Sequence, residues 1–271
     1  MIKRQSKQRE VFSISKKKKK QPQQRSAKHS KPKKTIGQKI SNAFFNLIMV
    51  LLLIVGLALV FNNQIKNYLV KDATKKYTVE NVSREDIVKN EQDGEATFDF
   101  EAVESLDLNL VAKASQQDFG MNVVGGIAIP SVELNLPIFK GVSNYVISVG
   151  AGTMKEDQRM GRGNYALASH YMYDPTLLFA PLVNVALGSS IFLTDLDYIY
   201  EYKVTMKEYV EPTRVEVIDD VEDKRLVTLV TCDVSGANRL IIQGELVKKA
   251  KSDDANKDMS DAFNLAQNNV Y

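Results

Sequence analysis

An apolar run of nineteen residues, 43–61, is interrupted only by Asn46 near its start. As an α-helix this run spans about 28 Å, close to the thickness of the hydrocarbon core of a bilayer. It therefore predicts one transmembrane helix over residues 41–62. The rest of the chain is then divided between the two sides of a membrane.

The charge distribution predicts which side is which. Residues 1–40 carry fifteen Lys or Arg and one Glu, a net charge of +14, which leaves −11 for residues 41–271. The positive-inside rule places the N-terminus in the cytoplasm and everything after Asn62 outside the cell. A cleavable signal peptide also has a basic start and an apolar core. Here, however, the basic region is about forty residues long and FNNQIK after the run offers no small-residue cleavage site, so the sequence favours a retained anchor.

The basic region contains a run of five lysines at residues 16–20. Such a run can bind nucleic acid, but its place before a membrane span favours a disordered cytoplasmic tail, residues 1–40, that lies against anionic lipid. We therefore expect the membrane, and not nucleic acid, as its partner.

Four further segments are expected after the span. Residues 63–82 are polar and typical of a stalk. In residues 83–119, Ser83 precedes an Asp by three positions, a capping signature, and residues 100–114 hold good helix formers, so one or two short helices are predicted. Residues 120–249 contain short β-branched runs separated by Gly, Pro and Asn. Residues 250–271 are polar and are expected to form a loose tail.

The clearest strand of the β-rich segment is residues 198–210. In it, one face is apolar and the other polar: Tyr198, Tyr200, Tyr202, Val204 and Met206 alternate with Glu201, Lys203, Thr205 and Lys207. Seven or eight strands of this kind predict an all-β fold with minor helices, arranged as a closed or nearly closed antiparallel barrel.

The chain's only cysteine, Cys232, ends one β-branched run, and Arg239 begins the next. Two strands joined by the short polar segment between them would bring both residues to one end of a strand pair. An exported domain with one cysteine has no internal disulfide, and such a cysteine often packs as a small buried hydrophobe.

His170 is the only histidine after the basic tail, and it ends the run YALASH. A single histidine at a strand end is commonly a bystander. One Cys and one His are too few to hold zinc, so no metal and no cofactor are expected. Cys, His and Arg together can, however, carry out acyl transfer, with a thiolate as nucleophile, an imidazolium as acid and a guanidinium beside the oxyanion.

Three short motifs stand out: TLVTC at residues 228–232, ASH ending at His170, and the Arg seven residues past the cysteine. In these motifs the sequence resembles the class A sortases. The segments GGIAIPSVELNLPIFKG, VGAGTMKEDQRMGRGNYALASH and PTRVEVIDD are also similar to class A segments, so the likeness covers residues 124–247. It implies an eight-stranded β-barrel transpeptidase, anchored on the outer face of a Gram-positive cell.

The resemblance also implies a reaction. Such an enzyme recognises an LPxTG sorting signal on exported surface proteins, cleaves between Thr and Gly, and holds the product as a thioester on Cys232. An amine of the peptidoglycan precursor lipid II then releases the product, and water does so when no amine is present. By matching motif positions, Cys232 is the nucleophile, His170 the acid and base, and Arg239 the residue that orients substrate and stabilises the oxyanion.

The same matching gives a substrate groove, made of Ala168, Val215, Val217, Ile218, Val230 and Thr231. Valines at these spacings could equally pack a barrel core. In a strict strand Ile218 would point away from Val215 and Val217, so we expect a loop that wraps around the substrate.

Some class A sortases bind calcium between the loop before the catalytic His and the loop before the cysteine strand. Counting back from His170 puts Lys155, Gln158 and Arg162 where the acidic ligands would be, and only Asp220 remains. We therefore expect no dependence on calcium, and a solvated acidic loop at residues 219–223.

Other functions remain open at this point. A pilus-polymerising class C sortase usually has an Asp-Pro-aromatic lid ahead of the barrel and a second membrane span. Here Asp174-Pro175 is followed by Thr176, comes after the histidine, and no apolar run follows Val247. A non-catalytic anchored wall-binding module would hold Cys232 packed and inert, whereas a plain cysteine protease would release its product to water even when amines are abundant.

Overall fold

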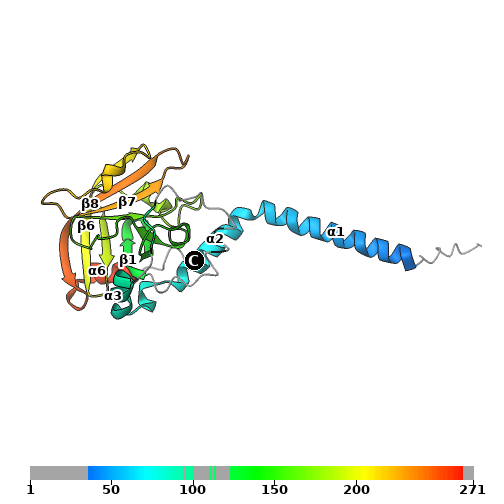
Figure 1. Ribbon diagram of the computed structural model, residues 1–271, viewed down its shortest axis with the longest axis horizontal. Coiled ribbons are helices and arrows are strands. Elements are labelled where there is room, and N and C mark those ends of the chain that lie inside the picture. The colour runs from blue at the N-terminus through cyan, green and yellow to red at the C-terminus, as the bar shows by residue number, and fades with distance from the viewer. Residues whose placement is uncertain (1–35, 94–95, 100–109, 111–112, 114–122, 265–271) are drawn as a thin grey trace, which may run out of the picture. The chain divides into compact units, whose positions relative to one another are not determined.

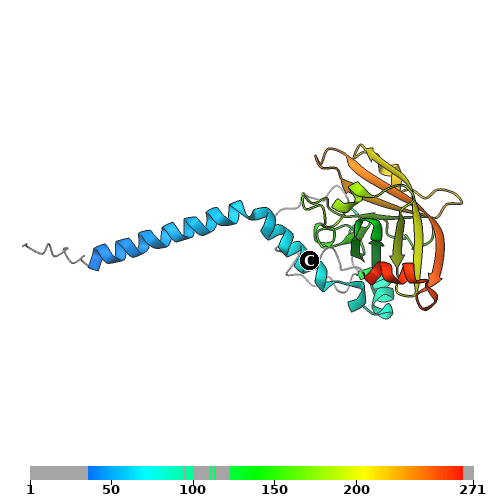
Figure 2. The same ribbon diagram turned by 180° about the vertical axis from the view of Figure 1, so that it is seen from behind.

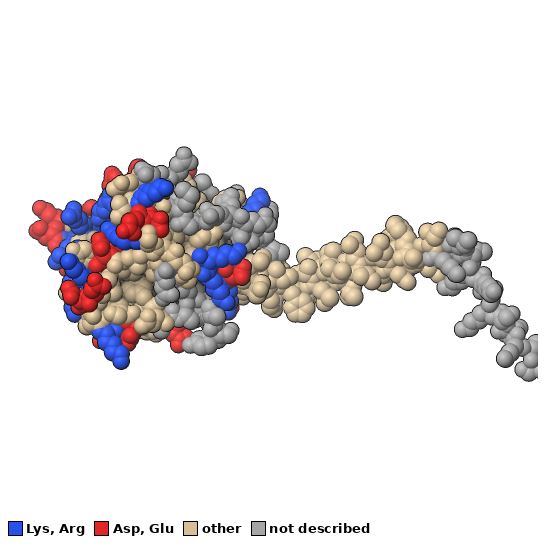
Figure 3. Space-filling model, turned by 90° about the horizontal axis from the view of Figure 1, so that it is seen from below, with Lys and Arg blue, Asp and Glu red and all other residues tan. Residues whose placement is uncertain are grey.

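The structure is a computed structural model that describes residues 36–93, 96–99, 110, 113 and 123–264. The chain divides into two compact units, residues 1–52 and 53–271. The first described helix, α1 (Ile36–Val60), includes Ile40–Val60, the one stretch among the described residues that is long and apolar enough to cross a membrane. Residues 40–60 carry no charged side chain, and Figure 3 shows them in uninterrupted tan. The predicted span is thus helical.

The segment expected to be a stalk is instead mostly helical. Helix α2 (Asn62–Lys76) buries Val70, Ala73 and Thr74, and the Thr74 hydroxyl donates to the Val149 carbonyl oxygen at 2.8 Å. These three residues form a narrow stripe on one face of a helix whose other residues are mainly polar. The polar composition that suggested a stalk belongs to the exposed faces of a packed helix.

After the short 3-10 helix η1 (Val79–Asn81), helix α3 (Arg84–Asp93) begins where the Ser83 signature predicts. The Ser83 hydroxyl accepts from the Asp86 N–H, and the Asp86 carboxylate accepts from the Ser83 N–H, both at 3.1 Å. This reciprocal pair is a capping box. The second short helix was predicted over residues 100–114, which lie outside the described residues except for Leu110 and Lys113.

Eight strands close into a barrel in the order β1-β2-β3-β4-β7-β8-β6-β5, as the sequence predicts for the fold class (Figure 1). The strands are β1 (Val123–Ile129), β2 (Leu134–Phe139), β3 (Ala151–Thr153), β4 (Asn164–Ala168), β5 (Ser190–Thr194), β6 (Tyr198–Val210), β7 (Leu226–Cys232) and β8 (Arg239–Lys251). The connections hold η3 (Pro130–Val132), α5 (Asn144–Ile147), η4 (Ala180–Asn184) and η5 (Val215–Ile218). All neighbours are antiparallel except β2–β3 and β4–β7, which are parallel. The predicted closed barrel is therefore confirmed, and the expectation that its strands are antiparallel is wrong for these two pairs.

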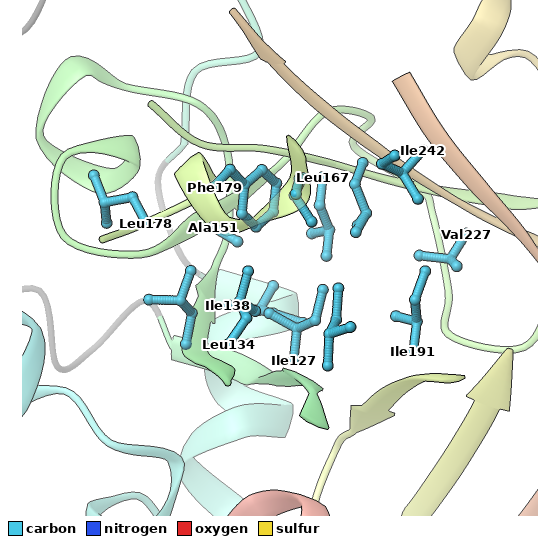
Figure 4. Packing of buried hydrophobic residues seen from close by; sticks show 14 of the residues in the cluster. Ile127, Leu134, Ile138, Ala151, Leu167, Leu178, Phe179, Ile191, Val227 and Ile242 are labelled. Atoms are coloured by element: carbon cyan, nitrogen blue, oxygen red, sulfur yellow. The ribbon is translucent and has the colours of Figure 1, made fainter. Parts of the chain in front are cut away.

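The barrel interior is packed by aliphatic side chains from strands around its circumference. Figure 4 shows Ile127, Leu167, Ile191, Val227 and Ile242 converging from five strands. All five are fully buried. Burying a side chain of this size stabilises the fold by about 1.5–3 kcal/mol.

The described part of the C-terminal segment is not loose. After β8 the chain forms η6 (Ser252–Asp254), α6 (Lys257–Asp261) and η7 (Ala262–Asn264). The Asn256 side chain caps α6 by accepting from the Met259 N–H at 3.0 Å. Met259 is fully buried against Ala128 of β1 and Phe192 of β5, so α6 covers the outside of the barrel wall (Figure 2). A single methionine in a polar segment is only a weak indication of a packed helix, which is why the sequence predicted a loose tail.

Candidate active site

Three neighbouring strands, β4, β7 and β8, carry the predicted chemical residues at one edge of the barrel. Cys232 is the last residue of β7 and is paired directly with Arg239, the first residue of β8. In the parallel β4–β7 pair, Ala168 is paired with Val230, and His170 and Cys232 each follow two residues later. Neighbouring strands lie about 4.8 Å apart. The structure thus brings His170, Cys232 and Arg239 to the same barrel edge.

Contacts beyond the last ladder pair keep β4 and β7 together up to this edge. The Ser169 N–H donates to the Val230 carbonyl oxygen at 3.3 Å, and the Thr231 hydroxyl donates to the Ser169 carbonyl oxygen at 2.9 Å. Thr231 is buried, so its side chain joins the two strands from within.

His170 is held in a buried position. Its backbone N–H donates to the Ile147 carbonyl oxygen, and its backbone carbonyl oxygen accepts from the Phe179 N–H. The residue is only 8% exposed, and its Nε2 atom has no hydrogen-bond partner among the described residues. Burial, with a smaller contribution from the positive charge of Lys66, lowers the pKa of His170 from 6.5 to about 4. The imidazole in this conformation is neutral at pH 7 and can accept a proton.

Arg239 and Cys232 are both half-buried, and Cys232 is a free thiol. The Arg239 guanidinium donates from Nη1 to the carbonyl oxygens of Gly236 and Asn238, at 3.3 and 3.4 Å. These long contacts hold the guanidinium, a permanent cation, against the turn between β7 and β8. A thiol, a neutral imidazole and a guanidinium at one edge can perform nucleophilic acyl transfer.

The turn between the two strands is itself ordered by Asp233. Its carboxylate accepts from the Ser235 hydroxyl at 2.7 Å and from the Asn238 amide at 3.0 Å. These hydrogen bonds lower the pKa of Asp233, the one from Ser235 most strongly. The turn therefore keeps a negative charge and a fixed shape close to Cys232.

The predicted groove residues fall in two places. Val215, Val217 and Ile218 form η5, a short 3-10 helix in the connection from β6 to β7, so they lie on a loop as expected and not on a strand. Val215 is 67% exposed. Ile218 is half-buried and packs against the same cluster as Ala168 and Val230. An apolar surface thus runs from η5 to the ends of β4 and β7.

The positions that would match calcium ligands carry other contacts. Lys155 pairs with the Asp220 carboxylate at 2.6 Å, and the Gln158 side chain bonds both the N–H and the carbonyl oxygen of Ala166. The hydrogen bond from Lys155 is the largest cause of the lowered pKa of Asp220. Arg162 is exposed. Within the described part of the chain, no three His, Cys, Asp or Glu side chains gather in a way that could hold a metal.

The sequence did not predict two residues near the site, Lys66 and Asn164. Lys66 is close enough to influence His170 only because α2 packs on the barrel, which its polar composition concealed. Asn164 is buried at the start of β4, and a polar residue opening the apolar run NYALA was the available signal.

The chain is similar in sequence to known proteins over most of its length. The sortase domain model matches residues 127–247. Sortase A of Streptococcus agalactiae is 42% identical over 239 residues, covering 84% of this chain and 96% of that protein. Sortase A of Listeria monocytogenes is 43% identical over 206 residues, covering 75% of this chain and 92% of that protein. The solved structure of Listeria monocytogenes sortase A has 43% sequence identity and a TM-score of 0.49, and the match covers 52% of this chain and 97% of the chain in that structure. The chain therefore belongs to the sortase family of transpeptidases.

Proposed function

We propose that this sortase cleaves an LPxTG sorting signal between Thr and Gly and transfers the protein to an amine of a peptidoglycan precursor. The observation that supports this most directly is the pairing of Cys232 with Arg239 beside the end of the strand that leads to His170. The similarity to two relatives named sortase A, at 42% and 43% identity, favours a class A sortase over a class C sortase.

In this proposal the reaction starts with a proton transfer. His170, neutral at pH 7, takes the proton of the Cys232 thiol, and the thiolate attacks the carbonyl carbon of the substrate Thr. The carbonyl oxygen becomes an oxyanion, which the Arg239 N–H donors stabilise. The bond to the Gly nitrogen then breaks, and the His170 imidazolium protonates the leaving amine. The product remains as a thioester on Cys232.

The second half of the reaction reverses these proton transfers. The amine of lipid II attacks the thioester carbonyl, His170 removes a proton from the attacking nitrogen, and the thiol of Cys232 is restored as the new amide forms. Water takes the place of the amine when none is present, and the product is then a free carboxylate.

The Leu and Pro of the signal would pack on the apolar surface that Ala168, Ile218 and Val230 share, with exposed Val215 at its margin. Val217 on η5 and Thr231 on β7 complete the proposed groove. The Thr231 side chain is buried and contributes by holding β7 to β4 through its hydrogen bond to the Ser169 carbonyl oxygen. Exposed apolar groups such as Val215 gain burial when substrate arrives.

The proposed location follows from α1. We propose that α1 anchors the chain in the membrane with the basic N-terminal region in the cytoplasm and the barrel outside, where surface proteins and lipid II are met. Nucleic acid has no part in this function.

The test is transpeptidation by the full-length chain in detergent. An LPxTG peptide is mixed with a series of amines, and the products are weighed by mass spectrometry. We expect an amine-capped LPxT product that is absent with Cys232→Ala and severely reduced with His170→Ala or Arg239→Ala. A peptide with Ala in place of the signal's Leu is the matched control.

Two outcomes would contradict the proposal. Full turnover by His170→Ala or Arg239→Ala would remove the assigned role of that residue. A product that is always hydrolysed, however abundant the amine, would indicate a cysteine protease instead.

A further inference from the structure

Asn164 is the first residue of β4 and is only 1% exposed. A buried amide must be hydrogen-bonded, because an unpaired buried polar group costs about 1–3 kcal/mol. The partners of this amide therefore show what the residue holds in place.

Both donors of the Asn164 amide are used on the η5 loop. Nδ2 donates to the carbonyl oxygens of Val217 and Asp219, each at 3.1 Å. These two carbonyls belong to the last turn of η5 and its C-cap. One buried side chain thus holds the end of the loop that carries the proposed groove residues.

The acceptor side of the same amide is fixed by the barrel wall. Asn164 Oδ1 accepts from the Thr228 hydroxyl on β7 at 2.7 Å, and the Thr228 hydroxyl accepts from the Gln243 amide on β8 at 3.0 Å. A hydroxyl has one proton, so a Thr228 oxygen that accepts from Gln243 gives its proton to Asn164. This chain of hydrogen bonds orients the amide with its nitrogen towards η5.

A second contact fastens the chain just after η5. The Asn164 N–H donates to Asp220 Oδ1 at 2.8 Å, and a Cβ added at Gly163 would lie 2.5 Å from Asp220 Oδ2. Gly163 also has a φ of +51°, a conformation that favours glycine. The two segments, residues 163–164 and 217–220, are therefore fitted to one another.

The ion pair of Asp220 with Lys155 holds the η5 segment more weakly than the Asn164 hydrogen bonds do. Its side chains are 27% and 67% exposed, and solvent-exposed pairs contribute about 0–1 kcal/mol. The Asn164 side chain is buried, its bond from Thr228 is buried and its two bonds to η5 are part-buried, so losing them costs more than losing an exposed ion pair. The η5 segment needs such an anchor because it has only four residues, no side-chain N-cap and an exposed Val215.

We propose that Asn164 is a positioning residue for sorting-signal binding, holding η5 in the conformation that receives the signal's apolar residues. It touches neither substrate nor thiol and acts through Val217 and Asp219. The inference rests on the proposed function, since it names a residue that serves the same groove.

The test compares Asn164→Ala with a matched variant in the full-length chain. The control is Asn135→Ala, because Asn135 is another buried strand asparagine, and its Nδ2 donates to the Phe263 carbonyl oxygen on the C-terminal segment. We expect Asn164→Ala to raise KM for the LPxTG peptide about tenfold, equal to about 1.4 kcal/mol, with kcat within about twofold. Asn135→Ala should lower the thermal midpoint and leave KM unchanged.

Three further measurements separate positioning from misfolding. Thr228→Val removes the hydroxyl that orients the amide and should also raise KM, even if Asn164→Ala does not fold. Discrimination between Leu and Ala in the signal should fall in both variants. Iodoacetamide is a small reagent that does not bind in the substrate groove. The rate at which it alkylates Cys232 should therefore stay at the wild-type value.

The outcomes that overturn the proposal are distinct. Wild-type KM and wild-type discrimination in folded Asn164→Ala or Thr228→Val would overturn the role of Asn164, as would an equal rise in KM with Asn135→Ala. An inactive wild-type chain would overturn the proposed function, and this inference with it.

Discussion

The buried imidazole of His170 predicts that folding stability falls on acidification. In the folded chain the His170 pKa is lowered from 6.5 to about 4, mainly by burial. In the unfolded chain the ring regains its ordinary pKa, so below pH 6.5 the unfolded state binds a proton that the folded state excludes. The stability contribution is fully present above pH 6.5 and is lost as the pH falls through about 4. These pKa values give a loss of about 2 kcal/mol between pH 7.5 and pH 5, and about 3 kcal/mol by pH 4.

The assay is urea unfolding of the full-length chain in nonionic detergent, followed by far-UV circular dichroism at pH 7.5 and pH 5. Carboxyl groups titrate in the wild type and in the variants alike. The difference between wild type and His170→Gln in the stability lost from pH 7.5 to pH 5 therefore reports the contribution of the imidazole. His29→Gln changes the only other histidine in the sequence and should keep the wild-type pH dependence. An equal loss of stability in wild type and His170→Gln would refute the reasoning, as would a histidine NMR titration that places His170 at 6.5.

Three further predictions follow from burial and charge. Leu167→Ala should lower the free energy of unfolding by about 2–5 kcal/mol, measured in urea, because Leu167 is fully buried in the barrel; a change below about 1 kcal/mol would contradict this packing. Val70→Ser should loosen α2 and admit water to the imidazole, so the His170 pKa should move up from about 4 towards 6.5 in an NMR titration, and an unmoved pKa would show that α2 does not exclude that water. Added calcium should leave the thermal midpoint unchanged, because the Lys155 ammonium already lies 2.6 Å from Asp220, and a raised midpoint would reveal a calcium site.

The positions of Cys232 and Arg239 could be predicted from sequence because each lies at one end of a β-branched run. Cys232 and Arg239 flank a short polar turn, and in the structure they form a directly opposed pair. Periodicity marks strands and their ends, and a short turn forces the two strands to be adjacent. These two residues therefore needed no long-range information.

The place of His170 depends on information that the sequence pattern lacks. Alternation indicates which side chains share a face, but it does not indicate the direction of a neighbouring strand. In the antiparallel barrel that the pattern suggested, the ends of β4 and β7 would lie at opposite edges. Because β4 and β7 are parallel and are connected through β5 and β6, both end at the same edge, and His170 and Cys232 both lie there.

The packing of α2 was concealed for a different reason. Its buried stripe consists of Val70, Ala73 and Thr74, and two of these three side chains are small. Such a stripe is too narrow to outweigh the nine other polar residues of this fifteen-residue segment when the prediction rests on composition. The helix is recognised only once the barrel surface that receives it is present.

The burial of His170 has a consequence for the proposed chemistry. A ring with a pKa near 4 stays neutral at pH 7 and is free to accept a proton, but it is also a weak base. It becomes a stronger base when a negative charge forms beside it, since an opposite charge raises the pKa of an imidazolium. The Cys232 thiolate is such a charge, so proton transfer and charge formation at sulfur support one another, and the fixed Arg239 cation stabilises the anion that results. In the proposed mechanism, the ion pair is therefore formed during the reaction instead of being held in the resting conformation.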